Sequence, residues 1–60
     1  MERIPESIKL IKEQLEQHRA NLRKLEGQAA LYGAGAVPLL LLNQIEAEKK
    51  EIARLQAELD

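Results

Sequence analysis

Apolar residues recur along the chain at alternating intervals of four and three, the heptad spacing of a helix that buries one seam. In the first half this pattern runs through Ile8, Ile11, Leu15, His18, Leu22 and Leu25, and continues to Ala29 and Tyr32. In the second half it runs through Leu41, Ile45, Glu48, Ile52, Leu55 and Leu59. The spacing predicts two long amphipathic helices whose seams face one another.

The ends of these helices can be predicted from proline and glycine. Pro5 and Pro38 suit the first turn of a helix, and Gly33 suits the left-handed position just beyond a helix end. We therefore expect helices over residues 5–32 and 38–60, joined by a turn over residues 33–37. A turn of about five residues makes the two helices antiparallel neighbours.

One turn length satisfies every layer of the predicted seam. When the chain is folded about residue 35, Leu25 faces Ile45 and Leu15 faces Leu55. The other layers match in the same way, and this agreement between levels supports the pairing. The predicted fold class is all-α, an antiparallel helical hairpin of the coiled-coil type.

Two helices cannot enclose a seam of this width, so we expect the hairpin to oligomerise into a four-helix or larger bundle. The chain has 60 residues and no cysteine, and domains of this size often need a partner chain when disulfides are absent. Isoleucine and leucine are mixed at both seam positions, so a homodimer is favoured while a trimer or tetramer also fits.

His18 and Glu48 are the strongly polar residues within the predicted seam. One hypothesis is that they pair, within a chain or between chains, and fix the register of the helices. The alternative is that both side chains lean to the edge of the seam and stay in solvent.

Five leucines lie off the seam and form a predicted second contact face: Leu10, Leu31, Leu39, Leu40 and Leu42. The last three belong to the run "VPLLLL", which is far shorter than the roughly 20 apolar residues of a membrane span. They could widen the seam and pack against partner helices, or dock another protein at the hairpin tip.

The composition argues against several classes of function. Basic and acidic residues are interspersed with a net charge of −1, and Tyr32 is the one aromatic residue, so we expect no nucleic acid and no membrane as partner. Ser7 and His18 have no neighbours that complete a catalytic or metal site. We therefore expect no enzyme, no cofactor and no metal, and a cytoplasmic location because "MERIPESIKL" is not a secretory signal.

Two stretches, "LRKLEGQAALYG" and "VPLLLLNQIE" followed by "IARLQAEL", resemble a family of helical hairpins in bacterial signalling and conflict proteins. These effector-associated domains precede caspase-like, TIR or STAND-type NTPase modules. The resemblance covers residues from about Ile8 to Leu59 and implies self-association or adaptor-like coupling. It also implies that the chain is the N-terminal part of a larger protein.

The function that we predict is that of a homo-oligomerisation module which clusters attached signalling or effector domains. The alternative is a heterotypic adaptor, in which the hairpin recruits a partner that carries a similar hairpin. The predicted oligomer interface comprises the twelve seam residues from Ile8 to Leu25 and from Leu41 to Leu59 named above.

Overall fold

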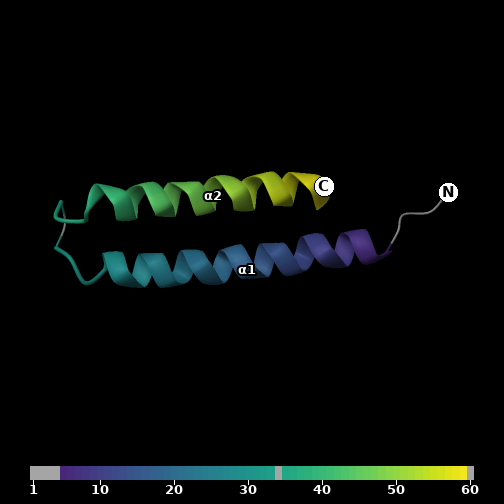
Figure 1. Cartoon of the computed structure of the whole chain (residues 1–60), viewed down its shortest axis with the longest axis horizontal. Coiled ribbons are helices and arrows are strands. Elements are labelled where there is room, and N and C mark those ends of the chain that lie inside the picture. The colour runs from purple at the N-terminus through teal and green to yellow at the C-terminus, as the bar shows by residue number, and fades with distance from the viewer. Residues whose placement is uncertain (1–4, 34, 60) are drawn as a thin grey trace.

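The structure, a computed structural model, describes residues 5–33 and 35–59, and for Pro5 and Glu6 it describes the backbone alone. These residues form two helices, α1 (Pro5–Ala29) and α2 (Leu39–Leu59), which run antiparallel side by side with the turn at one end (Figure 1). The predicted helical hairpin is confirmed. Residue 34 of the predicted turn and residue 60 of the predicted second helix lie outside the described residues.

Each helix carries one apolar stripe along its surface, and charged and amide-bearing residues make up much of the remainder. The 25 residues of α1 and 21 residues of α2 contain one interior glycine, Gly27, and no interior proline. At 1.5 Å per residue the helices are roughly 38 and 32 Å long. Helices of this length gain most of their stability from packing the apolar stripe rather than from intrinsic propensity.

Helix α1 ends at Ala29, three residues before the predicted boundary at Tyr32. The Ala30 N–H still donates to the Glu26 carbonyl at 3.0 Å, in the α-helical pattern. The next two N–H groups, of Leu31 and Tyr32, instead donate three residues back, to Gln28 and Ala29, both at 3.1 Å. The helix therefore tightens into a 3₁₀-type turn, which satisfies carbonyls at its end without a left-handed residue.

The reversal of the chain uses Gly35 rather than Gly33, so the prediction of a left-handed Gly33 was wrong. Gly35 has a φ of +80°, whereas Gly33 lies outside the left-handed region. The Ala36 N–H donates to the Gly33 carbonyl at 2.9 Å and closes a β-turn in which Gly35 is the third residue. A positive φ at that position is the requirement of a type II turn.

Helix α2 begins at Leu39, one residue after the predicted start. The Leu42 N–H donates to the Pro38 carbonyl at 3.1 Å, so Pro38 is the N-cap residue that precedes the helix. Its fixed φ and its lack of an N–H suit this end of a helix, where the first N–H groups have no helical partner.

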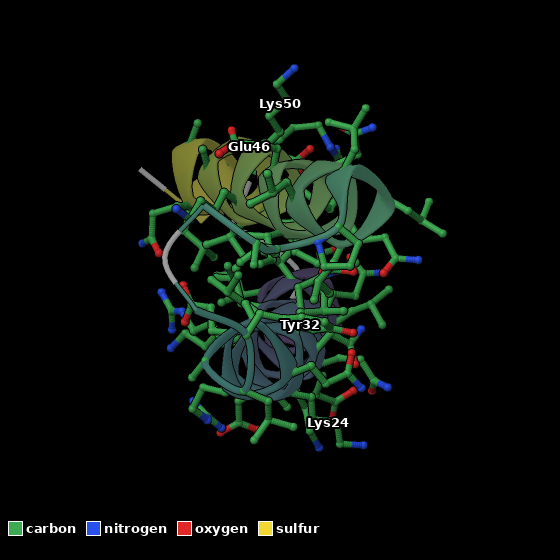
Figure 2. The ribbon with its side chains drawn as sticks, turned by 90° about the vertical axis from the view of Figure 1, so that its left-hand side faces the viewer. Lys24, Tyr32, Glu46 and Lys50 are labelled. Atoms are coloured by element: carbon green, nitrogen blue, oxygen red, sulfur yellow. The ribbon has the colours of Figure 1, made fainter. Side chains whose placement is uncertain are left out.

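The core between the helices is thin. Among the described residues, the buried apolar side chains are Leu15, Leu41, Ile45 and Leu55, with Leu55 at 1% and Leu15 at 3% exposed. All four belong to the predicted seam. Figure 2, which looks along the hairpin from the turn, shows Lys24 and Lys50 pointing away from the opposite helix. The hydrophobic contact is thus a single line of side chains between two helices.

Candidate oligomerisation surface

The seam of the hairpin is only partly covered by its own two helices. Four of the twelve predicted interface residues are buried, and the other eight keep part of their surface in solvent. The half-buried residues are Ile8, Ile11, His18, Leu22, Leu25, Ile52, Leu59 and Glu48. Six of these eight are isoleucine or leucine, so a row of apolar side chains is left partly exposed along the hairpin.

The five leucines of the predicted second contact face are all exposed. Leu10 projects from α1, and Leu31 projects from the chain that follows α1. The other three, Leu39, Leu40 and Leu42, project from the first turn of α2. Tyr32 is exposed as well. Within the hairpin these side chains do not widen the core, so the structure leaves them uncovered near the turn and, in the case of Leu10, near the open end.

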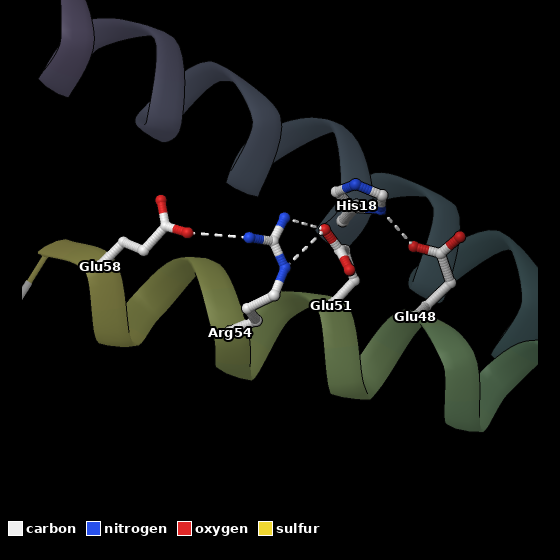
Figure 3. Close-up of polar contacts among 5 residues, drawn as sticks. All are labelled: His18, Glu48, Glu51, Arg54 and Glu58. Atoms are coloured by element: carbon white, nitrogen blue, oxygen red, sulfur yellow. Dashed lines mark hydrogen bonds and ion pairs between the residues drawn. The ribbon is translucent and has the colours of Figure 1, made fainter.

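His18 and Glu48 lie against each other across the seam, which confirms the hypothesis of a pair and places it within one chain. His18 Nδ1 and Glu48 Oε1 are 2.6 Å apart, and the two side chains are 29% and 22% exposed (Figure 3). An ionised carboxylate can only accept, so Nδ1 carries the proton and donates it. The pair satisfies two polar groups that would otherwise sit unpaired beside leucines.

Arg54 continues this line of polar contacts along α2 (Figure 3). Its Nη1 donates to Glu58 Oε2 at 2.8 Å, while Nε and Nη2 both donate to Glu51 Oε2. The hydrogen bonds from Arg54 lower the pKa of the Glu51 carboxyl below its ordinary value, and the charge of Arg54 acts in the same direction. The same contact raises the pKa of Arg54.

These polar residues define one side of the hairpin, which we call the ladder face: His18, Glu48, Glu51, Arg54 and Glu58. The sequence offered a His18–Glu48 pair as one of two hypotheses and gave no prediction for Glu51. The signal for Glu51 was its place three residues before Arg54, since residues at that spacing are neighbours on a helix.

The other side of the seam, which we call the groove face, is hollowed near the open end of the hairpin. A groove of about 730 Å³ lies there, with Ile8, Leu15 and Leu59 as its apolar lining. Lys9, Lys12, Arg19 and Gln56 are among the polar residues around it. Arg19 Nη2 donates to Gln56 Oε1 at 2.8 Å and so joins α1 to α2 beside the groove.

The two faces follow from the heptad positions. Leu15 and Arg19 are four residues apart and share the groove side of α1, whereas His18 lies three residues beyond Leu15 and reaches the opposite edge of the seam. A smaller hollow of about 330 Å³, lined by Leu25, Gln44 and Glu48 among others, lies on the ladder side. The groove face therefore offers the larger apolar surface.

The described residues contain no group of three or more histidine, cysteine, aspartate or glutamate side chains that could hold a metal ion. Of the two helices described, neither is long and apolar enough to cross a membrane.

No family model matches the chain, and neither a curated protein nor a solved structure matches it. The geometry of the hairpin and its uncovered surface therefore carry the argument for self-association.

Proposed function

We propose that this hairpin is a homo-oligomerisation module that brings attached signalling or effector domains together in the cytoplasm. The observation that carries the proposal is the row of half-buried isoleucines and leucines along the seam. Apolar surface gains about 25 cal/mol for each Å² removed from water, so a second copy that covers this row stabilises both chains. A homodimer forming a four-helix bundle is the simplest closed arrangement.

The mechanism of such a module is a rise in local concentration. Two domains joined to associating hairpins meet as if they belonged to one molecule, which can strengthen their contact by several orders of magnitude. The sequence resemblance to effector-associated hairpins of bacterial signalling proteins motivates the choice of signalling or effector domains as the cargo.

The test is the mass of the isolated chain in solution, measured by light scattering or sedimentation. We expect an oligomer, with the dimer favoured, at micromolar concentration. The variant Ile52→Lys places a charge on the half-buried seam and should abolish association. The matched control is Ala53→Lys, which places the same charge one residue away at an exposed position and should keep the wild-type mass.

A wild-type chain that is a stably folded monomer at micromolar concentration would refute the proposal. A chain that gains helical structure only when it is mixed with a different hairpin protein would support the heterotypic adaptor instead.

A further inference from the structure

Two features at opposite ends of the hairpin are complementary in shape. The groove near the open end has an apolar lining and no side chain that fills it. Leu42, at the start of α2 near the turn, is an apolar side chain that remains 44% exposed. The groove could therefore accept an apolar side chain, and Leu42 could be buried further by a second surface.

Leu42 lies on the groove face of the hairpin rather than on the ladder face. It precedes Gln56, which lines the groove, by two full heptads and therefore occupies the same heptad position. Leu39 lies one turn earlier on the same side of α2, because residues three apart are neighbours on a helix. Leu40, two residues before Leu42, points to nearly the opposite side of α2.

The charges around these two features also differ. The segment from Gly27 to Ile45 contains no charged residue, so this end can cover another surface without burying an unpaired charge. The groove carries Lys9, Lys12 and Arg19, together with Glu13 and Glu16. If two copies paired in parallel, the groove of one copy would lie directly on the groove of the other. The basic residues of the two copies would then face each other, and the two hollows would stay unfilled.

We propose that two copies pair antiparallel through their groove faces, with Leu42 of each copy seated in the groove of the other. This inference rests on the proposed self-association and specifies its geometry. The arrangement has a twofold axis, so both grooves are filled by the same contact. It leaves the ladder face, with its His18–Glu48 pair, on the outside of the central contact.

The positions along the helices fit this pairing. Leu42 lies near the turn and the groove lies around Leu15, about 20 Å apart along the hairpin at 1.5 Å per residue. The twofold axis then passes midway between them, close to Leu22 of α1, a half-buried seam residue that would meet its counterpart in the other copy. On α2 the midpoint falls between Glu48 and Lys49, so the exposed Lys49 side chains of the two copies lie beside the axis and must extend into solvent.

The first experiment compares Leu42→Asp with Leu40→Asp by the dissociation constant of the dimer. Both leucines are exposed in the hairpin, Leu42 at 44% and Leu40 at 70%, so neither change removes a core side chain. We expect Leu42→Asp to weaken the dimer at least tenfold, because burial of a leucine in the interface is lost. Leu40→Asp should change it less than threefold.

The second experiment measures the arrangement directly. The chain has no cysteine, so Ala36→Cys in the exposed turn gives one spin-label site per copy. Antiparallel pairing predicts roughly 40 Å between the two labels, close to the length of α1. Parallel pairing would bring the two turns within about 25 Å, the width of a small bundle.

The outcomes separate the two proposals. A dimer with a label distance under about 25 Å, or equal weakening by both aspartates, overturns the antiparallel groove contact and leaves self-association standing. A wild-type chain that is a folded monomer overturns both. A dimer with a distance near 40 Å and selective weakening by Leu42→Asp supports the inference.

Discussion

At the scale of single residues, His18 and Glu48 occupy seam positions that in most other layers hold isoleucine or leucine. Each side chain is more than two-thirds covered, and their hydrogen bond is the contact that makes this tolerable. A half-buried polar group without a partner costs about 1–3 kcal/mol, while replacing both partners by apolar groups can be neutral or stabilising. The pair is thus a specific link between α1 and α2.

This link predicts strong coupling between the two residues. We expect His18→Leu and Glu48→Leu each to lower the free energy of unfolding by about 1 kcal/mol, since each leaves one polar group without its partner. The double variant should be as stable as the wild type or more so. Denaturant unfolding at one fixed protein concentration measures all four species.

Additive effects of the two substitutions would contradict a direct interaction. Arg23→Leu serves as a control, because Arg23 is an exposed residue of α1 and its substitution should be additive with Glu48→Leu.

The Glu51 carboxyl gives a second prediction at this scale. Its pKa should lie below the ordinary value of 4.5 because Arg54 donates hydrogen bonds to it. A pKa lowered in the folded state stabilises the fold above the ordinary pKa, and this contribution disappears as the pH falls through the folded value. Titration of the Glu51 side-chain carbon by NMR measures the pKa directly.

The variant Arg54→Met removes the charge and the donors but keeps a long side chain. It should return the pKa of Glu51 towards its ordinary value, while Lys50→Met, on the outer side of α2, should not (Figure 2). An unchanged Glu51 pKa in Arg54→Met would show that Arg54 does not hold this carboxylate in solution.

At the scale of the elements, the sequence predicted both helices and their antiparallel pairing but placed their ends imperfectly. The heptad spacing constrains many residues at once, so one register satisfies Leu15, Leu55 and the other layers together. The end of α1 depends instead on a few backbone hydrogen bonds near Ala29, where 3₁₀ and α patterns compete. Gly33 and Gly35 are equally suited to a positive φ, and the geometry of the turn selects Gly35.

The two glycines Gly35 and Gly27 predict opposite effects of the same substitution. Gly35→Ala should destabilise the hairpin by about 1 kcal/mol, because alanine is strained at a φ of +80° although the space around it is open. Gly27→Ala should stabilise it by about 0.5–1 kcal/mol, because Gly27 is an exposed interior residue of α1. Thermal unfolding followed by circular dichroism compares them.

If both alanine variants shift the unfolding midpoint in the same direction, the assignment of Gly35 to the left-handed position of the turn is wrong. Gly33→Ala provides a further comparison within the turn and should be much milder than Gly35→Ala, since Gly33 has no left-handed φ.

At the scale of the whole molecule, four buried side chains hold two helices together, and this is a small core for 60 residues. Stability that depends on a second copy depends on protein concentration. For a dimer, each tenfold rise in concentration adds about 1.4 kcal/mol to the free energy of unfolding. We expect the thermal midpoint to rise by several degrees for each tenfold increase.

The thermal midpoint can be measured over about two decades of protein concentration, from roughly 1 to 100 μM. A midpoint that stays constant over this range would mean that the hairpin is stable as a monomer. Ile52→Lys should show no dependence on concentration, whereas Ala53→Lys should keep the wild-type slope.

The candidate interaction surface could be predicted from the sequence only in part. The heptad pattern identifies the seam residues. Which of them become buried in a single hairpin depends on how the two helices pack against each other, and this packing leaves Leu22 and Ile52 half-exposed. The groove beside Ile8 and Leu59 is formed jointly by residues of α1 and α2 near the open end. No local spacing in the sequence encodes such a hollow.

The proposed antiparallel arrangement sets a requirement on any domain joined after Leu59. Leu59 ends α2 at the open end of the hairpin (Figure 1), so the two copies of Leu59 in the dimer are separated by roughly 30 Å along the bundle. A flexible linker spans about 5–6 Å times the square root of its length, so roughly 30 residues are needed to bridge that gap. With a shorter linker the same dimer acts as a spacer and holds the two domains apart; linker length thus decides whether pairing of the hairpins brings their cargo into contact.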